Sequence, residues 1–411
     1  MDTHTPDAST YAQRALVQAR KLAANPRGSA TEAEKQAAEY VQAQLQALGV
    51  ADVQLQPFSG ERSIWLFVAM AFGLALVGHA AFWLLRQPAG KVPAMLIAML
   101  AFAFSGYLIW RKFTGEDYPL HSDLPHGPSQ NVIASIPPRQ EARGRVVLVA
   151  HLDSHRAVFW FASDFMVKIF GIVSIVAIAG VFVAIPVYLL AGLTPSGVFA
   201  WLGAILAGFH FLAWFTGITA DLGRYSPGAN DNASSVGTLL AIAERLRAQP
   251  LQNTEVILAF TGCEESSGDG MLTLIKEGGA QLKQAVFIDF EMVGIGDGIS
   301  YIREEGNLSR HTIPLELETL VKEAGKEFGL GPVSTPFVGA STECSILLKH
   351  GYKAVCLIGF RKGSDYMPEW HRLTDTPDRL QEDALQRIHM LAWDLLQRLD
   401  QGSAWLRPAV K

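Results

Sequence analysis

Four long apolar stretches constrain this chain more than any other feature. They cover residues 63–85, 93–110, 169–193 and 198–220. Each is close to the roughly 20 residues that a helix needs to cross a bilayer, and a short link joins the members of each pair. The sequence therefore predicts two transmembrane helical hairpins, one within residues 63–112 and one within residues 166–220. Aromatic residues typical of a membrane interface lie near the ends of the first hairpin, namely Trp65, Trp83, Tyr107 and Trp110.

The other three segments predict one α/β unit that the hairpins interrupt. Residues 1–62 carry two amphipathic helical patterns and a short alternating strand, residues 113–165 hold the central strands, and residues 221–411 alternate strand and helix. Such alternation indicates a mostly parallel mixed sheet with helices on both faces. The expected fold class is therefore α/β, with four transmembrane helices in two inserted hairpins.

Composition supports membrane segments and excludes some functions. Hydrophobic residues make up 49% of the chain and charged residues only 18%, which is too apolar for an ordinary soluble protein of 411 residues. The net charge is −5 and the basic residues are scattered, so we expect no nucleic-acid partner. The three cysteines form no Cys-x-x-Cys motif, which argues against a disulfide scaffold and against a cysteine-bound zinc.

The strand pattern at residues 145–153 is the strongest chemical signal in the chain. An unbroken apolar run, typical of a strand buried on both faces, ends at His151 and Asp153. Residues two apart in a strand point the same way, so the imidazole could bind a metal while the carboxylate orients it or joins it as a ligand. For this pair alone, a simple polar strand end is a better explanation than a metal site.

Further polar clusters follow other strands or open helices, and each has an ordinary explanation when taken singly. Asp231 could cap a helix, Glu264 and Glu265 could lie in a solvated turn, and His371 could lie in a solvated loop. Asp289 and Glu291 share one face of an apolar strand, where an unpaired carboxylate is costly. Together, two histidines and at least three carboxylates at element ends suit a pair of borderline metals such as zinc.

These motifs, taken in order, closely resemble the di-zinc aminopeptidase family, which also holds glutamate carboxypeptidase and membrane-bound metallopeptidases. The matching stretches are His151-x-Asp153, the Gly228-Ala-Asn-Asp-Asn-Ala-Ser234 turn, Glu264-Glu265, the Glu291-Met-Val-Gly294 strand end and His371-x-x-x-Asp375-Thr376. The resemblance covers the polar segments of the chain and leaves out the four apolar stretches.

The resemblance implies a role for each site residue. His151 and Glu291 would bind one zinc, His371 and Glu265 the other, and Asp231 would bridge the two ions. Two further roles follow: Glu264 would be the general base, and Asp153 would orient His151.

The chain departs from the usual family pattern at two places. Glu291 stands where an aspartate is commonest, and strand alternation leaves Asp289 as an alternative ligand. The sequence Thr342-Glu343-Cys344 replaces the usual Ser-Asp-His, which bears on substrate selectivity.

The expected function is therefore a membrane-anchored zinc metallopeptidase that hydrolyses peptide bonds with a water bridging two Zn²⁺ ions, or two Co²⁺ or Mn²⁺ ions. An aminopeptidase acting on peptides with a free N-terminus is the first expectation, and a carboxypeptidase is a variant of it. Three other classes stay open: a catalytically silent membrane scaffold, a single-zinc glutaminyl-cyclase-like transferase, and a transporter. The spans contain few charges, which favours an anchor over a transporter.

We expect an integral membrane protein of a bacterial-type plasma membrane. Two hairpins return the chain to one side, so the whole catalytic unit shares one face of the bilayer. The polar start carries no signal-peptide pattern, which favours the cytoplasmic face. Two histidines, His79 and His210, lie inside the spans, and we expect each to be hydrogen-bonded to a neighbouring helix.

Overall fold

The apolar run that ends at His151 forms the central strand of a mixed sheet. The computed structural model describes residues 7–328, 330–334, 340–361 and 367–402. Within them the sheet has the order β1-β2-β4-β3-β5-β9-β6-β7, with β8 also paired to β6. The strands are β1 Asp52–Glu61, β2 His126–Ile136, β3 Gly144–His151, β4 Thr254–Thr261, β5 Val286–Glu291, β6 Gly298–Glu305, β7 His311–Thr312, β8 Gly331–Ser334 and β9 Lys353–Phe360.

The centre of the sheet is parallel and its flanks are antiparallel. Strands β4, β3, β5 and β9 run in the same direction, whereas β2 is antiparallel to both β1 and β4, and β6 is antiparallel to β9. Residues Val146 to His151 of β3 are all buried, as expected for a strand covered on both faces. Because parallel strands end at the same edge, the carboxyl ends of β3, β4 and β5 lie side by side.

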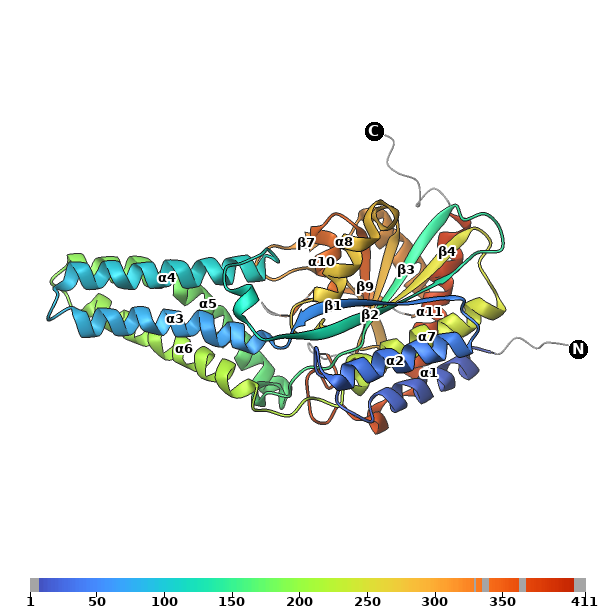
Figure 1. Ribbon diagram of the computed structural model, residues 1–411, viewed down its shortest axis with the longest axis horizontal. Helices are drawn as coiled ribbons and strands as arrows, with labels where there is room; N and C mark the ends of the chain where they lie inside the picture. Colours follow the sequence, from blue (N-terminus) through green and yellow to red (C-terminus); the bar gives the residue numbers. More distant parts are fainter. Residues whose placement is uncertain (1–6, 329, 335–339, 362–366, 403–411) are drawn as a thin grey trace, which may run out of the picture.

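Helices cover both faces of this sheet (Figure 1). Helices α1, α2, α7 and α11 pack together on one face, and α8 and α10 cover the other. The helices of this part of the chain are α1 Ala8–Leu22, α2 Glu32–Ala47, α7 Ser234–Ala248, α8 Asp269–Lys283, α9 Leu315–Gly325, α10 Glu343–Lys349 and α11 Glu382–Gln401. The expected α/β class with helices on both faces is confirmed, although α8 and β6 were not predicted.

Four further helices leave the α/β part as a separate bundle, drawn on the left of Figure 1. They are α3 Ile64–Leu85, α4 Lys91–Phe113, α5 Asp164–Leu193 and α6 Val198–Ala220. All four are long and apolar enough to cross a membrane. Each packs on two neighbours, since α3 contacts α4 and α6 while α5 contacts the same two helices from the opposite side.

The two histidines of the spans meet inside this bundle. His79 of α3 lies 2.9 Å from His210 of α6, measured between Nε2 and Nδ1, and its other nitrogen lies 2.7 Å from the hydroxyl of Tyr188 on α5. Each histidine is thus hydrogen-bonded to a neighbouring helix, as expected. The two are partners of each other, however, which their distance in the sequence did not reveal.

Paired backbone closes the base of each hairpin. The last residue of β1, Glu61, is opposite His126, the first residue of β2, and the first hairpin lies between them. Arg156 and Tyr225 form an isolated antiparallel bridge around the second hairpin. Both hairpins therefore start and finish at the same end of the α/β part, close to the carboxyl edge of the sheet.

Candidate metal centre

Each residue that the sequence analysis assigned to the site lies at the carboxyl edge of the sheet. His151 ends β3, Glu291 ends β5, and Glu264 and Glu265 follow β4. Asp231 lies in the turn before α7, and His371 lies in the segment after β9. The fold thus brings together side chains from five separate segments.

A first cluster forms around His151. Its Nε2 lies 3.4 Å from an oxygen of Asp231 and 3.4 Å from an oxygen of Glu291. The ligand atoms of these three buried residues all lie within 4.8 Å of one another, so a single ion could contact all of them.

A second cluster forms around His371. Its Nε2 lies 3.1 Å from Glu265 Oε2 and 3.5 Å from Asp231 Oδ2. Asp231 therefore presents one carboxylate oxygen to His151 and the other to His371. This is the arrangement expected of a carboxylate that bridges two ions.

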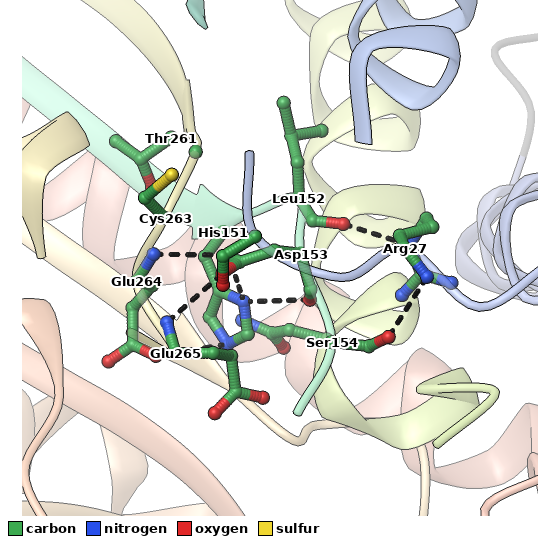
Figure 2. A network of polar contacts seen from close by, with 12 residues as sticks. Arg27, His151, Leu152, Asp153, Ser154, Thr261, Cys263, Glu264 and Glu265 are labelled. Atoms are coloured by element: carbon green, nitrogen blue, oxygen red, sulfur yellow. Dashed lines mark hydrogen bonds and ion pairs between the residues drawn. The ribbon is translucent and has the colours of Figure 1, made fainter. Parts of the chain in front are cut away.

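Asp153 ties the end of β3 to the turn after β4, as Figure 2 shows. Its carboxylate accepts hydrogen bonds from the backbone N–H groups of Glu264 and Glu265, both at 3.1 Å, and from the Ser29 hydroxyl at 2.6 Å. The same carboxylate lies 3.4 Å from Nδ1 of His151. Asp153 thus holds the backbone of both glutamates while facing the imidazole that it was predicted to orient.

Two asparagines and Asp375 fix the turn that carries Asp231. The backbone N–H groups of Asn230 and Asp231 donate to the Asp375 carboxylate at 2.7 and 3.1 Å. The Asn232 side chain donates to the Phe290 carbonyl at 2.8 Å and so joins the turn to the end of β5. Asp231 does not cap α7, whose N-cap residue is Ala233.

Glu264 borders the cavity beside both clusters. Its carboxylate is 4.0 Å from Nε2 of His151, and it lines a cavity of about 300 Å³ together with Asp231, Glu265, Glu291 and His371. A cavity of this size accommodates a small ligand, so Glu264 borders the space available to a substrate.

The structure separates the two candidate carboxylates of β5. Glu291 faces His151, as described above. Asp289 is buried and accepts a hydrogen bond from the backbone N–H of Cys344 at 3.3 Å, on the side of α10. Its neighbour Glu343 accepts from the Thr261 hydroxyl at 2.6 Å. Of the two acidic residues on β5, Glu291 is therefore the one within reach of the first cluster.

Two residues of the site were missed from the sequence. The His155 ring stacks on the His371 ring, with centroids 3.8 Å apart, and its Nδ1 lies 2.8 Å from the Arg156 carbonyl. Arg27 is buried and donates to the carbonyls of Leu152 and Gly228, both at 2.8 Å. His155 follows Asp153 by only two residues, so its position next to a predicted site residue could have indicated a place in the site. Arg27 comes from a distant loop with no recognisable motif.

The electrostatics of the site fit bound cations. Burial raises the pKa of Glu264, Glu265 and Glu291 well above the ordinary value, with additional effects from neighbouring carboxylates. Burial lowers the pKa of His371 to about 4, which keeps its imidazole neutral and able to act as a ligand. Both Glu265 Oε1 and His371 Nδ1 are buried without a hydrogen-bond partner among the described residues.

The chemistry of these ligands points to zinc. Two imidazoles and three carboxylates match the nitrogen and oxygen ligands that zinc takes in catalytic sites. A pair of divalent cations would also offset the repulsion among the buried carboxylates. The residues present therefore fit two metal ions.

Comparison with known proteins supports this chemistry. The model of peptidase family M28 matches residues 206–396, which include Asp231, Glu264, Glu265, Glu291 and His371. No curated protein matches the chain by sequence.

Solved structures share the fold at low identity. A leucine aminopeptidase precursor from Bacteroides thetaiotaomicron has 15% identity and a TM-score of 0.52, with 94% of this chain and 96% of that chain covered. A Zn-dependent exopeptidase from Parabacteroides distasonis has 14% identity and a TM-score of 0.54, with 97% and 99% covered. A glutaminyl cyclase from Bacteroides thetaiotaomicron has 15% identity and a TM-score of 0.54, with 94% and 97% covered.

Proposed function

We propose that this chain is a membrane-anchored di-zinc aminopeptidase, and the match of the peptidase family M28 model to residues 206–396 supports its assignment as a zinc metallopeptidase. The observation that carries the proposal is the position of Asp231, which faces His151 with one oxygen and His371 with the other. One ion would be held by His151, Asp231 and Glu291, and the other by His371, Glu265 and Asp231. Zinc is the expected metal, and Co²⁺ or Mn²⁺ could replace it.

Bound zinc supplies Lewis acidity and lowers the pKa of water. The residues of the chain provide the remaining steps. Glu264 lines the cavity and is not needed for either cluster, so it is free to accept a proton from the attacking water and deliver it to the leaving amine. Asp153 positions the Glu264 and Glu265 backbone, and Asp375 holds the turn of Asp231.

The reaction proposed is hydrolysis of the first peptide bond of a substrate with a free N-terminus. Residues of the helical bundle, including Ile64 and Phe113, line one side of the cavity beside the clusters.

Helices α3 to α6 would anchor this enzyme in the bilayer. Their length and apolar character support two membrane hairpins, and their shared base keeps the α/β part on one face. We place that part on the cytoplasmic face. Protease digestion of inverted and right-side-out vesicles tests the orientation, because only inverted vesicles should lose the α/β part. Loss of the α/β part from right-side-out vesicles would place that part on the outer face instead.

The function is tested with purified protein and with Glu264→Gln. The wild type should bind two zinc ions per chain and release the first residue of a short peptide. The variant should retain both ions and lose about 10²- to 10⁴-fold in kcat, because glutamine cannot accept the proton. Glu277→Gln, on the exposed side of α8, is the matched control and should leave kcat unchanged. Full activity of Glu264→Gln would show that Glu264 is not the general base.

The same assay distinguishes the proposed aminopeptidase from a glutaminyl cyclase. A peptide that begins with glutamine should lose this residue as free glutamine if the chain is a peptidase. A cyclase would instead retain the residue as a ring and release ammonia. The two metal clusters favour hydrolysis by a di-metal site, and a single zinc per chain with ring formation would overturn that assignment. A silent scaffold predicts neither product and no bound metal.

A further inference from the structure

A second cavity, inside the helical bundle, adjoins the cavity at the metal centre. Beside the 300 Å³ cavity lies a second cavity of about 120 Å³, and both are lined by Ile64, Phe113, His155, Trp370 and His371. The second cavity therefore adjoins the first one at the imidazoles of His155 and His371. Its two ends differ in character, because one meets the metal ligands and the other is enclosed by membrane helices.

Apolar side chains from three helices form the wall of this second cavity. Val68 and Phe72 come from α3, Val173 and Ile178 from α5, and Ala213 from α6. Phe72 is eight residues along α3 from Ile64, so the cavity extends about 12 Å into the bundle at 1.5 Å per residue. Its volume is slightly smaller than the roughly 150 Å³ of a dry apolar cavity that accepts benzene. It is thus suited to one branched or aromatic hydrocarbon group.

The end of the bundle next to the α/β part also carries exposed apolar residues. Phe159 is 50% exposed, Phe165 is 70% exposed and Leu222 is 83% exposed. Phe159 adjoins Trp160 and Phe161, which line the cavity, and the segments on either side of the hairpin are joined by the bond from Ala157 N–H to the Arg224 carbonyl. If α3 to α6 span a bilayer, these exposed residues lie at the level of the membrane interface.

We propose that the enzyme takes an amphiphilic peptide bound to the membrane surface and inserts its bulky apolar N-terminal side chain into the helical bundle. The inference rests on the proposed aminopeptidase activity and adds the substrate class to it. The side chain fills the cavity between α3, α5 and α6 while the adjoining amide lies at the metal clusters. The hairpins then form part of the specificity pocket as well as the anchor.

Substitutions on α5 test whether the bundle is the pocket. Val173→Trp fills the cavity from its wall, and Ile172→Trp places the same side chain on the outer surface, where Ile172 is 56% exposed. The measurement is kcat/KM for two tripeptides that begin with phenylalanine or alanine and are otherwise identical. Val173→Trp should lower the ratio of the phenylalanyl to the alanyl value by about 10- to 200-fold, as for the loss of a hydrophobic subsite. Ile172→Trp should leave the ratio unchanged. Ala213→Leu fills the same cavity from α6, and it provides a second test should Val173→Trp fail to fold.

Proteoliposomes test the membrane-bound substrate. The phenylalanyl peptide is compared with the same peptide carrying a C-terminal tetradecyl chain, of which about ten molecules are bound to vesicles for each one free at millimolar lipid. The anchored peptide should be cleaved faster than the soluble one.

Three outcomes would overturn parts of this reasoning, and each identifies its own target. If both cavity-filling variants keep the wild-type ratio of phenylalanyl to alanyl kcat/KM, the bundle does not form the specificity pocket. Equal rates for the anchored and soluble peptides remove the membrane-bound substrate. Failure of the zinc-loaded wild type to cleave the alanyl peptide, as well as the phenylalanyl one, overturns the proposed function and this inference with it.

Discussion

Replacing Asp153 by asparagine tests the idea that one carboxylate organises the metal centre. One of its oxygens accepts from the Glu264 backbone N–H and the other from the Glu265 N–H and the Ser29 hydroxyl. Asparagine has the same shape but only one acceptor oxygen. Whichever way its amide turns, an NH₂ group faces one of the two backbone N–H donors.

The size of the effect follows from these contacts. One backbone N–H in a buried site loses its acceptor, which costs about 1–3 kcal/mol, and His151 loses the negative charge 3.4 Å from Nδ1. Loss of a group that supports a metal-binding histidine lowers metal affinity by about 10- to 100-fold. We therefore expect Asp153→Asn to fold, to bind zinc 10- to 100-fold more weakly, and to lose activity at limiting zinc.

Competition with a chromophoric chelator measures the zinc affinity, and a thermal melt measures folding. Ser29→Ala removes one of the hydrogen bonds without changing charge and should cost only about 1 kcal/mol of stability. Asp52→Asn, at an exposed position, is the control. Zinc affinity in Asp153→Asn that equals the wild-type value would refute the supporting role of this carboxylate.

Three other changes test the second metal cluster, a buried histidine and the helical bundle. His371→Ala should reduce bound zinc from two ions to one per chain by elemental analysis, and retention of both would contradict the assignment. Burial and the nearby Arg245 charge lower the pKa of His389 to about 3 from the ordinary value of 6.5, so the unfolded chain binds this proton more readily than the folded one. Stability should therefore fall by about 2 kcal/mol between pH 7 and pH 5, and His389→Phe should remove that part of the pH dependence of the melting temperature. A Cβ at Gly217 would lie 2.6 Å from the backbone of α3, so Gly217→Val should destabilise the bundle by about 1–3 kcal/mol, whereas Gly208→Val, with nothing within 4 Å, should not.

The elements with clear periodicity could be predicted from the sequence. The apolar run before His151 identified the central strand, because a short run without polar alternation is typical of a strand covered on both faces. Length and composition alone identified the four long helices. The strand β6 was missed, since it lies between turn residues and ends in three charged residues, Arg303, Glu304 and Glu305.

The candidate site was predictable in its residues but not in its contacts. The choice between Asp289 and Glu291 depends on which neighbouring element each carboxylate meets, and that is set by the packing of α10 against β5. The stacking of His155 on His371 joins two loops that the sequence cannot bring together. The roles of zinc ligands and of the base stay predictions, for which the measurements above are the test.

The paired backbone at the base of each hairpin makes the bundle an exchangeable module. Glu61 and His126 are opposite each other in a regular antiparallel ladder, and Arg156 and Tyr225 form an isolated antiparallel bridge. A turn of two to five residues is enough to connect such neighbours. Replacing both hairpins by short turns would therefore leave the strand order intact and yield a water-soluble form of the catalytic part, although Trp160 and Phe161 would lose the helices that now cover them. Gain or loss of helical hairpins at these two turns could therefore convert a water-soluble enzyme into a membrane-bound one, or the reverse, during evolution.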